Sequence, residues 1–250
     1  MRVLIVTAGS HGDVAPFTGL GHRLQQAGHH VAIAAHGLFA DLVRECGLEY
    51  RRLPGDPVEL ARTRTAAPSP GAGRAIFAAF LEELGHGLVA AAHAGADVLL
   101  TAFGPAPLSR AVADGFGIPS VGTYLIPAVP TARFPLPGWP GSGDLGRAGN
   151  LAAGRELLGR AAGLYAEVLP PLRARLGLPP AGNPAETNPA AGWPICHGFS
   201  PAVVPRPDDW PAEVRVTGYW WPARPAGWQP PAELVDFLAA GSAPVFVGFG

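Results

Sequence analysis

Short apolar runs alternate with helical patterns along the first 124 residues. The runs at 2–8, 30–35 and 97–102 are continuous, which is typical of strands buried on both faces of a parallel sheet. A more exposed strand is predicted at 48–53, where apolar and polar residues alternate, and another at 118–124. These runs provide five strands of one sheet.

Between the strands, apolar residues recur at helical spacing. The predicted helices cover 15–27, 39–46, about 74–94 and 107–117, and the segment 54–72 is predicted to be a loop. This alternation predicts an α/β fold, a Rossmann-like parallel sheet with helices on both faces. Ligands of such sheets bind at the carboxyl ends of the strands.

The second half of the chain is richer in loops. A long loop at 125–149 precedes a helix that is predicted to begin at Asn150, as N-cap, and to run to about residue 176. Further predicted elements are strands at 195–200, 214–221 and 244–250 and a short helix at 231–240. The last strand has no helix after it, so we expect a domain at 1–222, a linker at 223–243 and the first strand of a second, incomplete domain at 244–250.

Composition narrows the possible partners. The formal net charge is −1, only 15% of residues are charged, and lysine is absent, so no basic surface for nucleic acid is expected. Cys46 and Cys196 are isolated, which predicts neither a disulfide framework nor a zinc site. No signal peptide and no apolar run near 18 residues is found, so we expect a cytoplasmic protein without an integral membrane segment.

The stretch "VTAGSHGDVAPF" at 6–17 places polar residues where the first strand meets the first helix. Gly9 and Gly12 have GxxG spacing, and no acidic residue follows the second strand, which disfavours a dinucleotide site. A P-loop is excluded because there is no lysine. Ser10, His11 and Asp13 are neighbours along one loop, a poor arrangement for a catalytic triad.

Asp13 has two possible roles. Its carboxylate could accept a proton from a bound hydroxyl group, or it could cap the helix by accepting backbone N–H groups of the first turn. The pattern supports both roles equally. His11 is interpreted as a residue that lines the site.

No metal site is predicted. Glu82, His86 and His93 share one helical face without a second ligand cluster, and Asp208 and Asp209 lie in a proline-flanked turn that lacks DxD spacing. Most of the six tryptophans are expected to fill cores and loops.

Five segments together resemble the amino-terminal half of a GT-B glycosyltransferase, of the branch that modifies sterols, glycopeptides and macrolides. They are "GSHGDVAPFTGLGHRLQQAGHHVAIAA", "FGIPSV", "FSPAVVPRPDDW", "VRVTGYWW" and "FLAAGSAPVFVGFG". The resemblance implies an inverting, metal-independent transfer of a hexose from a nucleotide-sugar, a UDP- or TDP-sugar used as co-substrate without a further cofactor, to a lipophilic hydroxyl compound.

The resemblance also assigns roles to residues. It implies that Asp13 is the general base and that Ser10, His11 and Gly12 lie near the donor diphosphate. It further implies an acceptor pocket shaped by the 125–149 loop, with acceptor-binding residues Phe103, Tyr124, Phe134 and Trp139. Some branches use a histidine base oriented by an aspartate after the fourth strand. Leu100-Thr101-Ala102 has no carboxylate there, which is consistent with an aspartate base that needs no orienting acid.

The family's donor motif would lie beyond Gly250, so we expect that this chain needs a C-terminal GT-B domain and has little transferase activity alone. The alternative is a non-catalytic small-molecule-binding module or truncated relative. A nucleotide-dependent reductase is a third possibility and would require NAD(P) binding.

Overall fold

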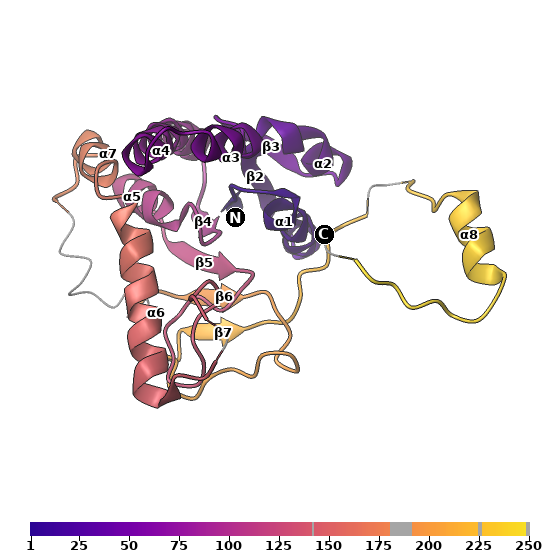
Figure 1. Ribbon diagram of the computed structural model, residues 1–250. Coiled ribbons are helices and arrows are strands. Elements are labelled where there is room, and N and C mark those ends of the chain that lie inside the picture. Colours follow the sequence, from indigo (N-terminus) through magenta and orange to yellow (C-terminus); the bar gives the residue numbers. More distant parts are fainter. Residues whose placement is uncertain (142, 181–191, 225–226, 249–250) are drawn as a thin grey trace.

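The computed structural model describes residues 1–141, 143–180, 192–224 and 227–248. Within these residues, seven strands form one sheet in the order β3-β2-β1-β4-β5-β6-β7, and every neighbouring pair is parallel (Figure 1). The strands are β1 (Arg2–Val6), β2 (His30–His36), β3 (Glu49–Leu53), β4 (Val98–Thr101), β5 (Ser120–Tyr124), β6 (Ile195–His197) and β7 (Val214–Val216). The predicted Rossmann-like parallel sheet is therefore confirmed.

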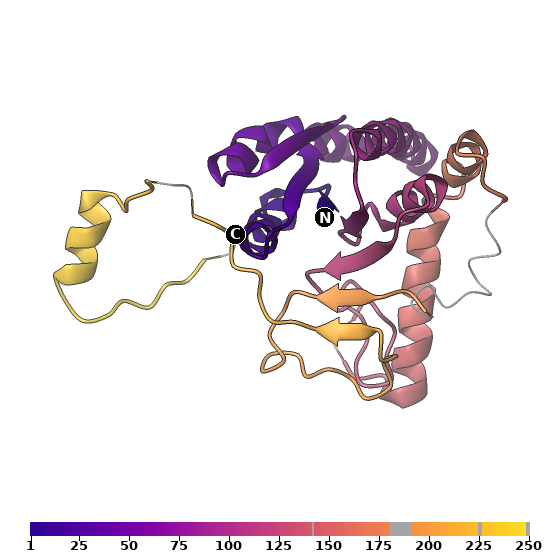
Figure 2. The same cartoon turned by 180° about the vertical axis from the view of Figure 1, so that it is seen from behind.

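Helices cover both faces of the sheet. The helices in the described part of the chain are α1 (His11–Gln26), α2 (Ala40–Glu45), α3 (Pro57–Thr65), α4 (Pro70–His93), α5 (Ala106–Phe116), α6 (Gly146–Gly163), α7 (Leu169–Arg175) and α8 (Ala232–Ala239), with a 3₁₀ turn η1 at Gly37–Phe39. Helices α1 and α2 contribute to one core cluster, and α4, α5 and α7 to another. Figures 1 and 2 show the two groups on different sides of the strands.

The alternation of side chains along β1 explains why its sequence is continuously apolar. Val3 and Ile5 pack with α1 and α2, whereas Leu4 and Val6 pack with α4 and α5. All four are 4% exposed or less. Burying one side chain of this size contributes about 1.5–3 kcal/mol, so a strand with two covered faces must be apolar at every position.

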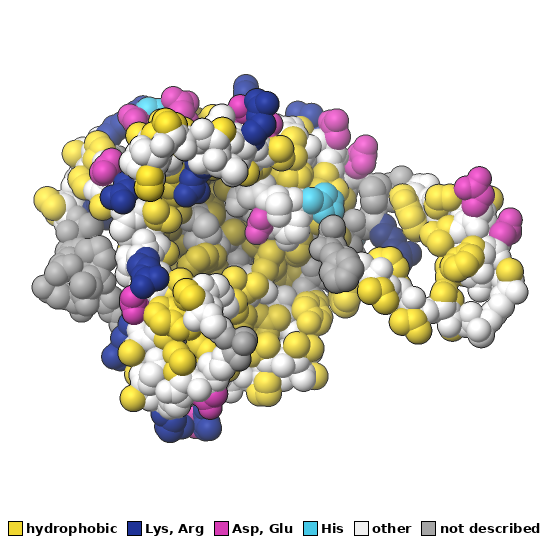
Figure 3. Space-filling view, viewed as in Figure 1, with side chains coloured by type: hydrophobic (Ala, Val, Ile, Leu, Met, Phe, Trp, Pro, Cys, Tyr) yellow, Lys and Arg dark blue, Asp and Glu magenta, His cyan; other side chains and the backbone are white. Residues whose placement is uncertain are grey.

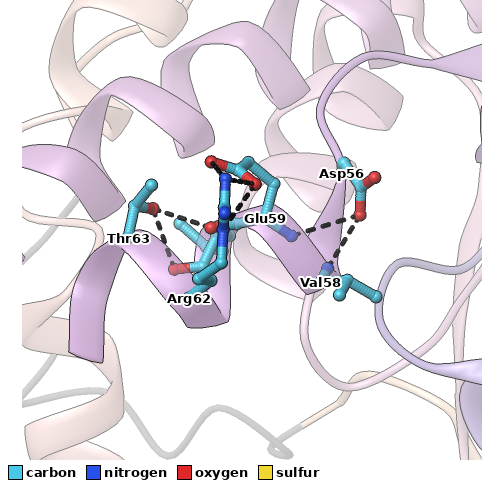
Figure 4. Close-up of polar contacts among 6 residues, drawn as sticks. Asp56, Val58, Glu59, Arg62 and Thr63 are labelled. Carbon is cyan, nitrogen blue, oxygen red and sulfur yellow. Dashed lines mark hydrogen bonds and ion pairs between the residues drawn. The ribbon is translucent and has the colours of Figure 1, made fainter. Parts of the chain in front are cut away.

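Two helix starts were missed by the prediction of a loop at 54–72. Asp56 caps α3, with its Oδ1 accepting the N–H groups of Val58 (2.8 Å) and Glu59 (3.4 Å), as Figure 4 shows. Ser69 caps α4 in the same way by accepting the N–H of Ala72. Both caps are followed by proline at the first helical position, which is a recognised start signal.

The helix predicted from Asn150 is wrong at its start and in its length. Helix α6 begins at Gly146, and Asn150 lies inside its second turn. The Oδ1 atom of Asn150 accepts the N–H of Leu145, the N-cap residue, so the side chain does satisfy the helix start, but from within the helix. The predicted continuation to 176 is interrupted after Gly163, and α7 starts anew around Pro170 and Pro171, which lack the N–H groups that a continuous helix would need.

The later strands are shorter than predicted. Strand β6 ends at His197, and the next residue, Gly198, lies against the Trp220 ring. Strand β7 ends at Val216, two residues before Gly218 with its φ of +83°. Residues 244–248 form no strand, since no strand in the described part of the chain lies beside them to form backbone hydrogen bonds. Residues 249 and 250, also part of the predicted strand, lie outside the described residues. Helix α8 lies away from the sheet, and the segment after it runs back from α8 in both views (Figures 1 and 2). The proposed domain boundaries stay a prediction.

Helix α4 departs from the expectation that no stretch could span a membrane. By length and composition alone its 24 residues are apolar enough to do so. Its inner face nevertheless belongs to the core of the sheet, where Leu81, Leu84 and Leu88 are at most 2% exposed.

Candidate functional site

The order of the strands defines the place where a ligand is expected. The chain leaves β1 toward β2 and leaves β4 toward β5, so the connections diverge between β1 and β4. In open parallel sheets this switch point carries the ligand at the carboxyl ends of the strands. Figure 3 shows this face hollowed between the region of α1 and that of β6 and β7, with hydrophobic side chains in the hollow.

Asp13 lies at the carboxyl end of β1, in the first turn of α1. Its Oδ2 atom accepts hydrogen bonds from the N–H of Ser10 (2.7 Å) and from the Ser10 hydroxyl (2.9 Å). Thr7 donates its hydroxyl to the Asp13 carbonyl. Gly9, with a φ of +144°, lies beside the carboxylate, and a Cβ built there would lie 2.3 Å from Oδ2. Only glycine lets the turn approach the carboxylate this closely.

Both roles considered for Asp13 are compatible with this geometry. The cap is present, because Oδ2 accepts a backbone N–H at the start of the helix. The side chain is half-buried, and in the part of the chain that the structure describes no donor bonds to Oδ1. One oxygen therefore fixes the carboxylate, and the other is available to a hydroxyl group. The role as general base stays a prediction.

Ser10, His11 and Gly12 form the N-cap and the first two residues of α1, and all three are exposed. The His11 ring lies edge-on to Phe39, with 6.4 Å between the ring centroids. A helix N-terminus carries unpaired N–H groups and a partial positive charge, which favours an anion such as a phosphate. The predicted phosphate role of this loop fits its position but stays a prediction.

Phe103 and Tyr124 lie together at the ends of β4 and β5. Their rings are perpendicular, with centroids 5.3 Å apart. Phe103 is 37% exposed, whereas Tyr124 is 5% exposed, and burial raises the pKa of the Tyr124 hydroxyl. The loop of Phe103 adjoins that of Asp13, because a Cβ on Gly104 would lie 3.8 Å from the Ala8 carbonyl oxygen. The Phe103 ring is thus exposed near the loop of Asp13, and it packs on the buried Tyr124 ring.

Phe134 and Trp139 lie in the long loop after β5. Phe134 packs against the core cluster that contains Tyr124, whereas Trp139 lies beneath the Arg160 guanidinium, 5.6 Å from the ring centroid. Trp139 also lines a cavity of about 370 Å³ formed by residues between 135 and 144. Neither Asp13 nor Phe103 lines this cavity. The structure therefore brings Phe103 and Tyr124 together but does not place Trp139 with them.

Exposed apolar side chains follow five of the strands at their carboxyl ends, a feature that the sequence analysis missed. They are Leu38 after β2, Phe103 after β4, Ile126 after β5, Val203 after β6 and Tyr219 after β7, and each is at least 37% exposed. We call these five residues the apolar rim. The sequence already contained this signal, because one large apolar residue comes shortly after each of these five strands.

Comparison with known proteins identifies the first part of the chain. Residues 3–98 match the glycosyltransferase family 28 N-terminal domain. The first part of the chain is therefore similar to that domain. The chain is 35% identical to the O-mycaminosyltylonolide 6-deoxyallosyltransferase of Streptomyces fradiae and 31% identical to a sterol 3-beta-glucosyltransferase of Arabidopsis thaliana. Both alignments cover the whole chain but only 61% and 41% of those proteins.

Solved structures share the fold of this chain. The glycosyltransferase of kitacinnamycin has a TM-score of 0.56 at 22% identity, over 92% of this chain and 55% of its own. The calicheamicin glycosyltransferase CalG4 has a TM-score of 0.55 at 18% identity, over 92% and 54%. The expected GT-B type of fold is thereby confirmed, and the chain spans about half the length of these structures.

Two histidines are buried at strand ends. His36, the last residue of β2, contacts the Pro54 carbonyl through Nδ1 (2.9 Å), and burial lowers its pKa. His197, the last residue of β6, accepts the N–H of Ala128 at Nε2 (3.4 Å), and burial lowers its pKa to about 4. Both are fully buried. They are therefore neutral core residues at pH 7 and are closed off from a substrate.

The acidic and histidine residues considered as metal ligands either bond to other protein groups or are exposed on α4. Asp209 bonds to Thr131 and Ala132, and Asp208 pairs with Arg133. Glu82, His86 and His93 are exposed on α4. Among the described residues of the chain, no group of three His, Cys, Asp or Glu side chains could hold a metal ion.

Proposed function

We propose that this chain is the acceptor-binding half of an inverting glycosyltransferase that transfers a hexose from a nucleotide-sugar to a hydroxyl group of a lipophilic acceptor. The apolar rim is the observation that carries this proposal. Five exposed apolar side chains follow strands at the carboxyl edge of the sheet, and at the same edge Asp13 has one carboxylate oxygen that accepts no donor among the described residues. An acceptor with a large apolar body and one hydroxyl group matches this combination.

The relatives support the acceptor class. One is named for transfer to a macrolide, O-mycaminosyltylonolide, and another for transfer to a sterol. Both names describe a polycyclic or macrocyclic alcohol. We therefore expect an acceptor of the sterol or polyketide type and a UDP- or TDP-sugar as co-substrate, held by a C-terminal domain, with no further cofactor.

In the proposed reaction, Oδ1 of Asp13 accepts the proton of the acceptor hydroxyl. The acceptor oxygen forms a bond to the anomeric carbon as the bond from that carbon to the diphosphate oxygen breaks on the opposite face. The electron pair of the broken bond leaves with the nucleoside diphosphate, and the configuration at the anomeric carbon is inverted. Ser10 holds Oδ2 and so orients Oδ1 toward the acceptor.

The N-terminus of α1 would assist the departing group. Ser10, His11 and Gly12 present the positive end of the helix next to Asp13. The diphosphate gains negative charge as the bond to the sugar breaks, so a positive dipole nearby stabilises the transition state. We place this reaction in the cytoplasm.

The test is Asp13→Asn in the complete protein that includes the nucleotide-sugar domain. Asparagine keeps the oxygen that caps α1 but cannot accept the proton, so we expect kcat to fall by roughly 10²- to 10⁴-fold with little change in the unfolding temperature. Asp41→Asn is the matched control, since Asp41 is an exposed acid in the first turn of α2. Near-normal turnover by Asp13→Asn would remove the assignment of the base.

The cap on Oδ2 favours a second candidate, a non-catalytic module that binds small molecules. In that case Asp13 would serve only the start of α1. The complete protein would then bind a lipophilic alcohol without transferring sugar from any UDP- or TDP-sugar. Product analysis by mass spectrometry distinguishes the two candidates.

A further inference from the structure

The long loop between β5 and α6 is held by side chains that come from far along the chain. The N–H of Ala128 donates to Nε2 of His197, and Nε1 of Trp210 donates to the Val129 carbonyl at 3.0 Å. His197 and Trp210 stack on each other with 4.8 Å between their ring centroids. The beginning of the loop is therefore fixed to the connection between β6 and β7.

Asp209 continues this attachment. Its two carboxylate oxygens accept the Thr131 hydroxyl and the Ala132 N–H, each at 2.6 Å. Thr131 is fully buried, although Asp209 itself is exposed. Hydrogen bonds to a charged acceptor are stronger than neutral ones, so this carboxylate sets the course of the backbone at 131–132.

Asn150 joins the two ends of the loop segment that begins after Ala132. Its Nδ2 donates to the Ala132 carbonyl (3.2 Å) and to Oδ1 of Asp144 (2.7 Å), while its Oδ1 accepts the N–H of Leu145 (3.0 Å). The residue is 1% exposed. A single buried amide therefore closes a loop tip, which we define as residues 133–141, 143 and 144.

The loop tip carries the features that could contact a ligand. It contains Phe134 and Trp139, and its residues between 135 and 144 line the cavity of about 370 Å³. Leu136 anchors the tip in the core at 3% exposure. The remaining side chains of the tip are half-buried or exposed, so its shape depends on how its two ends are held.

We propose that Asn150 and Asp209 are positioning residues that set acceptor selectivity by fixing the two ends of the loop tip. This inference rests on the proposed function, because it takes the tip to be part of the acceptor site. Neither residue contacts the reacting atoms in this proposal. A change in either would alter the shape of the tip, and therefore the preference between two acceptors, more than it alters the fold.

The experiment measures binding of two probes to the full chain by calorimetry. The probes are cholesterol, supplied from cyclodextrin, and O-mycaminosyltylonolide. Asn150→Asp keeps the size of the side chain but loses the donors to Ala132 and Asp144, and Asp209→Asn weakens the bonds to Thr131 and Ala132. Asp209 is exposed, so we expect Asp209→Asn to fold. If Asn150→Asp does not fold, the Kd ratio of Asp209→Asn alone tests the positioning role.

Asp97→Asn is the matched control. Asp97 also accepts a backbone N–H and side-chain N–H groups, all from Arg2, but it precedes β4 at the amino edge of the sheet. We expect Asn150→Asp and Asp209→Asn to change the ratio of the two Kd values by about tenfold, whereas Asp97→Asn leaves it within twofold.

Three results would overturn the inference. An unchanged ratio in folded Asp209→Asn, or an unchanged Kd where the wild type binds only one probe, removes the positioning role and leaves the proposed function intact. If Asp97→Asn changes the ratio as much as Asp209→Asn does, the change is a general effect of destabilisation, and the positioning role is again removed. If the wild type binds neither probe, the proposed acceptor function is lost together with the inference.

Discussion

The two halves of the sheet are held together by different interactions. Around β1 and β2, strands of five and seven residues form continuous ladders, and helices cover both faces. Around β6 and β7 the strands have three residues each, and long-range bonds between side chains and the backbone hold the loops. The first half is thus stabilised mainly by apolar burial, whereas the second also depends on a few polar groups that must stay correctly protonated and bonded.

The largest expected effect tests that dependence through pH. The pKa of His197 is about 4 in the folded protein against an ordinary value of 6.5, so the unfolded state binds a proton first as the pH falls. Its contribution is therefore complete above pH 6.5 and is lost as the pH falls to 4, about 3 kcal/mol in all. His36, whose pKa is also lowered, acts in the same direction.

His197→Gln isolates this contribution. Glutamine can still accept the Ala128 N–H but does not titrate, so urea unfolding between pH 7 and pH 4 should show a smaller loss of stability than in the wild type. His22→Gln, on the exposed side of α1, is the control and should keep the wild-type slope. If the stability of His197→Gln and of the wild type fell equally with pH, the stacking of residue 197 on Trp210 would not depend on a neutral histidine.

The next effect concerns the segment 217–223, which crosses from β7 over α1 and links the two halves. Trp220 packs on Phe17 with 5.6 Å between the centroids, and the Ala223 N–H donates to the Thr18 hydroxyl at 3.0 Å. A Cβ on Gly19 would lie 1.8 Å from the Trp221 carbonyl oxygen. Gly19→Ala should therefore displace the segment at a net cost of about 1–2 kcal/mol, after the better helix propensity of alanine is included.

The thiol of Cys46 reports this displacement. Cys46 is buried, its Sγ contacts the Ala223 carbonyl at 3.5 Å, and burial raises the pKa of the thiol, all of which slow its modification. In a Cys196→Ser background, a disulfide reagent should react with Cys46 roughly tenfold faster in Gly19→Ala. Gly159→Ala, at a helical glycine with open space around it, should leave the rate unchanged. Equal rates in both variants would mean that the segment is not held at Gly19.

The same contrast explains what could be predicted from the sequence. In the first half, helical spacing and burial agree. The helix predicted at 107–117 is α5, which ends at Phe116 and is capped by Gly117, whose φ is +64°. In the second half, the course of the 125–149 loop depends on His197, Asp209 and Trp210, which lie about 70–80 residues away. Local patterns carry no information about such partners, so the attachment of the loop could not be predicted.

The residues of the candidate site also fall into those that local sequence predicts and those that depend on distant partners. Asp13 and its cap could be predicted, because both depend on the local turn from Gly9 to Asp13. The pairing of Phe103 with Tyr124 follows from neighbouring strands, but the distance between Trp139 and this pair depends on the loop tip. The sequence predicts Asn150 as a cap because asparagine favours that position, whereas its donors serve Ala132 and Asp144.

Helix α3 is the exception within the first half, and it carries the smallest predicted effect. No residue of α3 is buried, so its start depends on the bonds of Asp56 and on the Glu59–Arg62 pair shown in Figure 4. Asp56→Ala should destabilise α3 locally by about 1 kcal/mol, because two N–H groups lose their acceptor. Hydrogen exchange at Val58 and Glu59 should accelerate, while the temperature of global unfolding stays within error and Asp56→Asn restores protection. A drop of several degrees in that temperature would instead show that α3 is part of the cooperative core, and that the first half also relies on a single polar contact.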